Sequence, residues 1–323
     1  MAGVLVAGLL VVMRTPGETY TGPFLPLTKT EKTVQDRLQQ HVYNLADRIG
    51  ERNVWHYASL VAAATYLEEE LRTLGYAVKT QAYSARKLTV KNLEAELTGV
   101  SQPAEIIIVG AHYDSVLGSP GANDNGSGVA ALLEIARLLA EQKLPRTVRF
   151  VAFVNEEPPF FYTEEMGSRV YARRSRHRSE SIIAMFSLEC FGYYSDEPGS
   201  QQYPFPFGLF YPKVGNFIGF VGNLSSRTLV REAVAAFRRQ TPFPSEGTAA
   251  PGWLAGVHWS DHWAFWKAGY PAIMVTDTAL FRYDHYHSST DTPDKLDYAR
   301  LARVTVGIAS VITELAGGAL IDK

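Results

Sequence analysis

Apolar residues recur at helical spacing over the first part of the chain. This period predicts amphipathic helices over residues 30–49 and 55–74, and Gly75 stands where a helix commonly ends. Residues 78–84 and 93–97 instead alternate between polar and apolar side chains. Alternation of this kind is typical of half-buried strands, so we expect an antiparallel pair at the edge of a sheet.

Two runs are almost entirely apolar, residues 105–110 and 148–154. They predict central strands, because a strand buries every side chain only when both faces of its sheet are covered. Helical spacing returns over residues 127–142, between the two runs. Farther along, the same criteria predict helices over residues 164–176, 224–239 and 296–316, and strands over residues 182–188, 217–221 and 271–276. This alternation predicts a three-layer α/β/α fold around a mixed, mostly parallel central sheet.

The N-terminus carries a separate apolar segment. Residues 2–13 contain no charge, but they are fewer than the roughly 20 residues that a membrane-spanning helix needs. Their length matches the apolar core of a signal peptide, although no Lys or Arg precedes them. Prolines at positions 16, 23 and 26 are typical of a linker. We therefore expect an export or membrane-tethering segment and linker over residues 1–28, followed by a single catalytic domain over residues 29–323.

This segment favours an exported protein, located in the periplasm or outside the cell and held at the membrane where the segment is retained. The alternative is a buried or disordered N-terminal arm. The single cysteine, Cys190, excludes an intrachain disulfide but does not decide the compartment.

Composition narrows the function only slightly. A chain of 323 residues with 46% hydrophobic and 20% charged residues is ordinary for one large globular domain. The formal net charge of -2 gives no reason to expect a nucleic acid partner. The chemistry must therefore come from particular residues.

Polar side chains follow the ends of three predicted buried strands. His112 follows the first strand, the pair Glu156–Glu157 the second, and Glu189 the third. Because open α/β sheets place their sites at the carboxyl ends of strands, we expect these side chains to meet. Clustered carboxylates repel one another unless a cation is present, and histidine with carboxylates suits zinc. A chance cluster of surface charges is the alternative.

At these positions the chain resembles peptidase family M28, zinc enzymes that include bacterial aminopeptidases and, as relatives, glutaminyl cyclases. The resemblance extends from about Thr30 to the C-terminus. It rests on four segments: His112-Tyr113-Asp114, GANDNGSG at residues 121–128, Asn155-Glu156-Glu157, and His287 in YHSSTD at residues 286–291. It implies the phosphorylase/hydrolase-like architecture of zinc exopeptidases.

The resemblance also implies roles for individual residues. His112 would ligate zinc, and Asp114 would influence it from behind. Asp124 would bridge two zinc ions, while Glu157 and His287 would serve as further ligands. Glu156 would be the general base.

Two segments depart from the usual pattern of the family. Glu189 stands where aspartate is common, and we assign it as a ligand because glutamate can also bind zinc. Residues 158–165 (PPFFYTEE) replace a short link, and we expect this aromatic loop to line the mouth of the pocket.

Together these features predict a zinc-dependent aminopeptidase that holds two zinc ions and cleaves peptides with a free N-terminus. One alternative is a single-zinc acyltransferase like the glutaminyl cyclases, which would form N-terminal pyroglutamate. The turn at residues 123–127 has the form found in the peptidases, which favours hydrolysis. A third alternative is a non-catalytic binding domain on the same scaffold, although no ligand and no base is missing.

Three other histidines are less suited to bind metal. His258 and His262 lie four residues apart but lack the glutamate of an HExxH motif, so we interpret Asp261 and His262 as packing or supporting residues and His258 as a pocket wall. His285 is interpreted as structural. The aromatic stretch over residues 203–220 is expected to be partly core strand and partly pocket lining.

Overall fold

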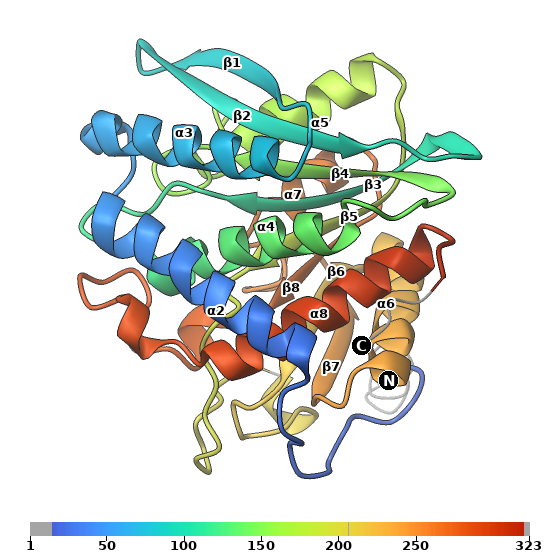
Figure 1. The fold of residues 1–323 in the computed structure, drawn as a ribbon. Coiled ribbons are helices and arrows are strands. Elements are labelled where there is room, and N and C mark those ends of the chain that lie inside the picture. The colour runs from blue at the N-terminus through green and yellow to red at the C-terminus, as the bar shows by residue number, and fades with distance from the viewer. Residues whose placement is uncertain (1–14, 206, 320–323) are drawn as a thin grey trace.

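The strands of the chain form one eight-stranded sheet in the order β1-β2-β4-β3-β5-β8-β6-β7 (Figure 1). The computed structural model describes residues 15–205 and 207–319. The strands are β1 (Lys79–Ala85), β2 (Leu88–Leu97), β3 (Gln102–His112), β4 (Arg146–Phe153), β5 (Ser181–Glu189), β6 (Ile218–Asn223), β7 (Ser245–Ala250) and β8 (Ala272–Thr276).

The sheet is mixed, as predicted. Strands β4, β3, β5 and β8 run parallel at its centre. The hairpin β1–β2 pairs antiparallel along β4, which confirms the predicted antiparallel edge. On the other side β6 runs antiparallel to β8 and is followed by β7, parallel to β6.

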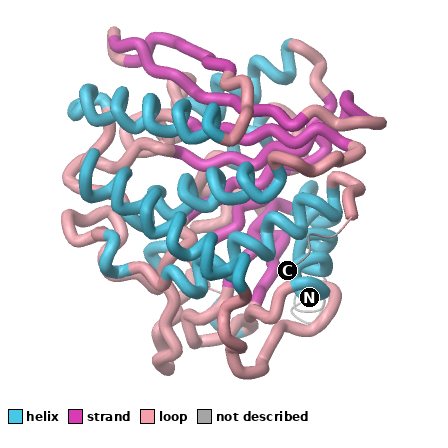
Figure 2. Tube along the Cα trace, in the orientation of Figure 1, coloured by secondary structure: helices cyan, strands magenta, loops and turns pink. Residues whose placement is uncertain are grey.

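Helices cover both faces, which confirms the three predicted layers (Figure 2). One face packs against a group of five helices: α2 (Lys29–Tyr43), α3 (Tyr57–Thr73), α4 (Gly128–Leu139), α6 (Arg227–Gln240) and α8 (Tyr298–Leu315). The other face packs against α5 (Gly167–His177) and α7 (His262–Lys267).

The central strands show why their sequences are apolar throughout. In β3, Ile107 and Val109 belong to the core beneath the five helices, while Ile106 and Ile108 belong to the core beneath α5 and α7. Because side chains alternate between the two faces of a strand, both sets are buried only when both faces are covered. The carboxyl ends of β3, β4, β5 and β8 therefore meet at one edge of this buried layer.

Two elements were missed by the sequence prediction, β7 and α7. Strand β7 has the sequence SEGTAA, in which Thr248 is the single β-branched residue and none is aromatic, so its composition does not indicate a strand. Its small residues suit the packing, since a Cβ on Gly247 would lie 2.7 Å from Val234 on α6. Helix α7 has only six residues, too few to show a clear period.

The segment before α2 is irregular and lies against the domain. Arg238 on α6 donates hydrogen bonds to Thr15 Oγ1 and to the carbonyls of Pro16 and Gly17, at 2.9–3.0 Å. Arg303 on α8 donates to the carbonyl of Leu25. The apolar residues 2–13, on which the export expectation rests, lie outside the described residues. Among the helices of residues 15–319 that the structure describes, none combines the length and hydropathy of a membrane span.

Deletion of residues 1–22 is expected to leave a folded, active protein, because no candidate site residue lies there. The melting temperature should fall by a few degrees, since Arg238 and the backbone N–H of Ser245 lose partners in the deleted segment. Thermal unfolding and an activity assay would check this. A truncated protein that melts normally but is inactive would show that the segment contributes to the active site.

Candidate metal centre and active site

Six candidate residues reach one place at the carboxyl edge of the sheet. His112 ends β3 and Glu189 ends β5, while Glu156 and Glu157 follow shortly after β4. Asp124 lies in the helical turn Ala122–Ser127 that leads into α4, and His287 lies in the loop after β8. Their ligand atoms form three overlapping groups: His112, Asp124 and Glu189; Asp124, Glu157 and His287; and His112, Glu156 and Glu157.

Asp124 connects the first two groups through its two carboxylate oxygens. Oδ1 lies 3.3 Å from His112 Nε2, and Oδ2 lies 3.0 Å from His287 Nε2. Glu189 Oε2 lies 3.4 Å from His112 Nε2, and Glu157 Oε2 lies 3.2 Å from His287 Nε2. Each imidazole thus has its own carboxylate and shares Asp124, which is the arrangement needed for a carboxylate that bridges two cations.

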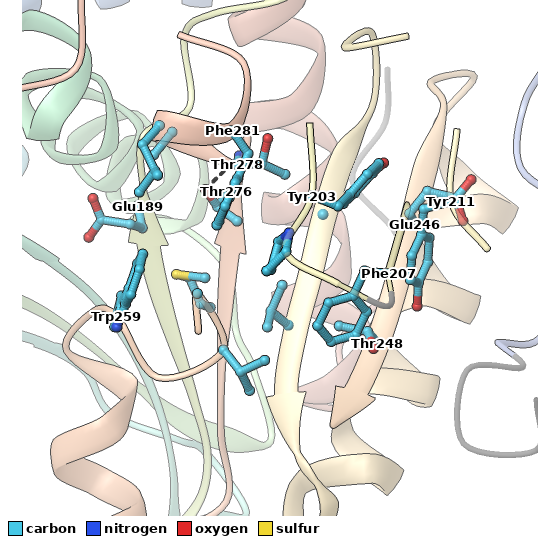
Figure 3. A pocket seen from close by; sticks show the side chains of 18 of the residues that line it. Glu189, Tyr203, Phe207, Tyr211, Glu246, Thr248, Trp259, Thr276, Thr278 and Phe281 are labelled. Atoms are coloured by element: carbon cyan, nitrogen blue, oxygen red, sulfur yellow. Dashed lines mark hydrogen bonds between the residues drawn. The ribbon is translucent and has the colours of Figure 1, made fainter. Parts of the chain in front are cut away.

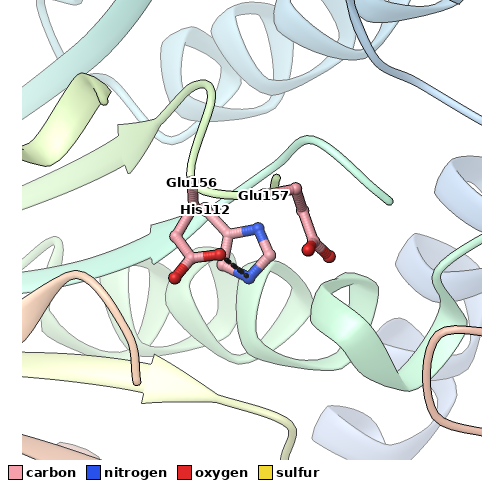
Figure 4. A group of neighbouring side chains, drawn as sticks. All are labelled: His112, Glu156 and Glu157. Atoms are coloured by element: carbon pink, nitrogen blue, oxygen red, sulfur yellow. Dashed lines mark ion pairs between the residues drawn. The ribbon is translucent and has the colours of Figure 1, made fainter. Parts of the chain in front are cut away.

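Glu156 lies next to His112 (Figure 4). Its Oε2 lies 3.8 Å from His112 Nε2, farther than the oxygens of Asp124 and Glu189. It belongs only to the group that also contains His112 and Glu157. Glu156 therefore lies beside the two groups that share Asp124 and belongs to neither of them.

Four polar atoms at this centre are buried without a hydrogen-bond partner among the described residues: His112 Nε2, His287 Nε2, Asp124 Oδ1 and Glu157 Oε1. A buried polar atom without a partner costs free energy, so four that converge on one place indicate a missing partner. Imidazole nitrogens and carboxylate oxygens without thiolates are ligands that zinc accepts. The residues therefore fit a divalent cation.

The pKa shifts of the carboxylates also favour a bound cation. Burial raises the pKa of Glu157 to about 7, with a further contribution from Asp124. Burial also raises the pKa of Glu156 well above its usual range, and Glu189 and Glu157 add to the effect although His112 opposes it. Several carboxylates thus compete for protons in a buried space, and bound cations would take the place of those protons.

The two histidines show the opposite shift. Burial alone would lower the pKa of His287, but the nearby carboxylates of Asp124 and Glu157 outweigh burial and raise it to about 10. The pKa of His112 is likewise raised well above its usual value, because Glu189 and Glu156 outweigh the effect of burial. Both imidazoles therefore hold a positive charge where a metal ligand would be neutral.

Asp114 holds the paired glutamates in place. Its Oδ1 accepts a hydrogen bond from the backbone N–H of Glu156 and its Oδ2 from that of Glu157, each at 3.1 Å. Its Oδ1 also lies 3.5 Å from His112 Nδ1. The expected position of Asp114 behind His112 is found, and the contact with Glu156 and Glu157 extends its influence to both glutamates.

The glycine-rich turn places Asp124 against β5. A Cβ on Gly128 would lie 2.6 Å from the carbonyl oxygen of Leu188, so only glycine allows this approach. The side chain of Asn125 donates to the same carbonyl at 2.8 Å and accepts from the backbone N–H of Cys190 at 3.1 Å. These contacts fix the turn that carries Asp124 against the end of β5.

Several supporting residues were not predicted. The carboxylate of Asp291 accepts hydrogen bonds from the backbone N–H groups of Asn123 and Asp124, at 2.8 and 3.1 Å. Ser260 donates to Glu189 Oε2 at 2.7 Å. Asp291 lies four residues after His287, so its nearness to a candidate ligand was the available signal, whereas Ser260 is 71 residues from Glu189 in the sequence.

Arg52 gave no sequence signal at all. Its buried guanidinium donates to five backbone carbonyls from separate segments, namely those of Leu45, Gly50, Tyr113, Pro120 and Gly121. Burial lowers its pKa to about 10, although nearby carboxylates, led by Asp291, oppose this. Arg52 fixes the loop after β3 and the start of the turn that carries Asp124.

The aromatic loop at residues 158–165 lies near Glu156. Burial raises the pKa of Tyr162 in this loop, and the charge of Glu156 adds a smaller contribution. The Tyr162 ring stacks on His258 with the centroids 5.6 Å apart and also contacts Trp263.

Three other histidines, His258, His262 and His285, lie outside the possible metal-binding groups found among the described residues. His258 Nδ1 contacts the carbonyl of Leu254, His262 Nε2 that of Val257, and His285 Nδ1 contacts Thr290 Oγ1.

Sequence comparisons agree with this geometry. Residues 92–312 match the model of peptidase family M28. The chain is 38% identical over 287 residues to an uncharacterized protein of Escherichia coli (strain K12), YfbL, covering 86% of this chain and 87% of that protein. It is 26% identical over 276 residues to leucine aminopeptidase 1 of Arthroderma otae, covering 79% of this chain and 67% of that protein.

Solved structures share the fold. A zinc aminopeptidase from Bacillus subtilis, BSAP, superposes with a TM-score of 0.70 at 16% identity, over 91% of this chain and 96% of that one. A glutaminyl cyclase from Fimbriiglobus ruber superposes with a TM-score of 0.63 at 22% identity, over 90% of this chain and 99% of that one. The fold alone therefore does not separate hydrolysis from cyclisation.

Replacement of Asp114 by Asn tests whether this residue positions the glutamate pair. One oxygen becomes an NH₂ group that faces a backbone N–H, so affinity for zinc should fall by about 10- to 100-fold. Competition with a chelating dye measures the affinity, and Asp294→Asn serves as an exposed control. Equal zinc affinity in Asp114→Asn and Asp294→Asn would show that the hydrogen bonds to the glutamate pair do not matter for binding.

Proposed function

The chain belongs to peptidase family M28, and we propose that it is a zinc-dependent aminopeptidase that removes residues from the free N-terminus of peptides. The observation that carries this proposal is the position of Asp124 between two groups, each with one histidine and one further carboxylate. The name of the fungal relative, leucine aminopeptidase 1, supports the same activity.

Two sets of ligands follow from the geometry. His112, Glu189 and Asp124 would hold one zinc ion, and His287, Glu157 and Asp124 would hold a second. Zinc at these positions supplies a Lewis acid for the scissile carbonyl and lowers the pKa of a water molecule toward ~7.

Glu156 would carry the proton. Its carboxylate belongs to neither of the two groups that share Asp124, and Asp114 fixes its backbone. Burial raises the pKa of Glu156, which makes its carboxylate a stronger base for a proton of the attacking water, and the same group would then deliver that proton to the leaving amine.

Cyclisation is the alternative chemistry on this fold. A cyclase uses the substrate's own amine as the nucleophile and needs one ion to polarise the γ-amide. One of the two groups that share Asp124 would therefore have no function in that reaction. A hydrolase can use two ions to hold the nucleophile and polarise the carbonyl, so the geometry favours hydrolysis.

Replacement of Glu156 by Gln separates the base from the ligands. The zinc content should stay close to that of the wild type, while the rate falls about 10²- to 10⁴-fold because the general base is lost. The neighbouring change, Glu157→Gln, should instead reduce the zinc content. Elemental analysis and the hydrolysis rate of an aminoacyl p-nitroanilide give both quantities.

The opposite result would reverse these roles. If Glu156→Gln loses zinc while Glu157→Gln retains it, then Glu156 is the ligand and Glu157 the base.

A peptide that begins with glutamine distinguishes the two reactions by mass. The aminopeptidase should release the N-terminal residue, and acetylation of the N-terminus should abolish the release because the free amine is lost. Mass spectrometry of the products measures both. Loss of ammonia without loss of a residue would establish the cyclase instead.

A further inference from the structure

A pocket opens beside Glu189, at the metal centre (Figure 3). It extends over β8 and β6 as far as β7, the strand that the sequence did not predict. Glu189 and Glu246 lie at its opposite ends, and the residues between them are mostly apolar.

The strand register explains the shape of the floor. Glu189 on β5 pairs with Thr276 on β8, Thr276 pairs with Gly219 on β6, and Gly219 pairs with Glu246 on β7. Directly paired residues project from the same face of a sheet. One row of side chains therefore leads from the metal centre to Glu246.

Gly219 keeps this row open. It places no side chain between Thr276 and Glu246, and a Cβ there would lie 3.3 Å from the carbonyl oxygen of Thr276. The next row of the floor, which includes Met274 and Val221, is largely apolar. The walls carry aromatic rings from three loops: Tyr203, Phe207, Tyr211, Trp259 and Phe281.

Glu246 ends this apolar channel with a carboxylate. In the described part of the chain, this carboxylate accepts no hydrogen bond, and its one charged partner is Arg238, whose Nη2 lies 3.9 Å from Oε2. The N–H groups of Arg238 are directed to Ser245 and to residues 15–17. The side chain of Glu246 is 20% exposed, so its oxygens remain accessible.

We propose that this pocket binds the N-terminal side chain of the substrate and that Glu246 selects a long side chain with a cationic end, lysine or arginine. The inference rests on the proposed aminopeptidase function. The negative charge of Glu246 at the far end of the pocket is the reason to expect a basic N-terminal residue.

The dimensions fit this class. Three strand spacings separate Glu189 from Glu246, about 14 Å between their backbones. Both glutamate side chains rise from the same face, so a similar distance separates their carboxylates, and the substrate backbone at the metal centre would occupy part of it. The remainder suits a stem of several methylenes, whereas a leucine side chain would end before Glu246. Aromatic walls favour both the apolar stem and the cation.

Norleucine provides the matched substrate, because it has the stem of lysine without the ammonium group. The wild-type enzyme should have a higher kcat/KM for lysyl than for norleucyl p-nitroanilide. In Glu246→Gln this preference should fall by about 10- to 100-fold, the usual value of a hydrogen bond to a charged group. Glu232→Gln removes an exposed charge on α6 and should keep the wild-type preference.

A second variant tests the path to Glu246. Gly219→Val should lower kcat/KM for both lysyl and norleucyl substrates and spare alanyl p-nitroanilide, because valine fills the row between Thr276 and Glu246. If long substrates are unaffected, the N-terminal side chain does not follow this row.

Binding of free amino acids tests the selection by Glu246 independently of the aminopeptidase activity. Calorimetry with the zinc-loaded full chain should show tighter binding of L-lysine than of L-norleucine, and Glu246→Gln should remove the difference. Equal affinities in the wild type would overturn the selection by Glu246, even with aminopeptidase activity intact. Selective lysine binding without cleavage of any aminoacyl substrate would contradict the proposed function and support the pocket.

Discussion

The mutual repulsion of buried carboxylates is the constraint on which the site depends. Asp124, Glu156, Glu157 and Glu189 converge, and two histidines and the more distant Arg52 are the positive groups that offset them. Burial raises the pKa of both Glu156 and Glu157. Such a cluster is stable only if protons or cations compensate it. The carboxylate of Asp124 favours compensation by cations, because each of its oxygens faces a different imidazole and could bind a different ion.

The scaffold holds the cluster through backbone contacts that carry no catalytic role. Asp291 fixes the backbone of Asp124, Asp114 fixes the glutamate pair, and Arg52 joins the loops beneath them. These hydrogen bonds limit the freedom of the ligands to move apart under their own repulsion. The parallel strands bring the ligands to one edge, and the strands beyond β8 extend that edge into a pocket.

The sequence predicted the parts of the site that depend on local pattern. The apolar runs of β3, β4 and β5 locate His112, the glutamate pair and Glu189. A polar residue that follows an apolar strand can be recognised in the sequence alone. Arg52 could not be found in this way, since three of its five partners are carbonyls 61–69 residues farther along the chain. The pocket floor also could not be found, because Glu189 and Glu246 share a row only through the register of four strands, one of which has no strand-like composition.

The most direct test of this account is the number of zinc ions bound by the wild type and by Asp124→Asn, measured by elemental analysis after dialysis. The shared carboxylate predicts about two ions per wild-type chain, as a two-metal hydrolytic site requires, and a clear loss in the variant, whose amide offers one oxygen instead of two. A wild-type chain that binds one ion, or an Asp124→Asn variant that binds as many ions as the wild type, would contradict it.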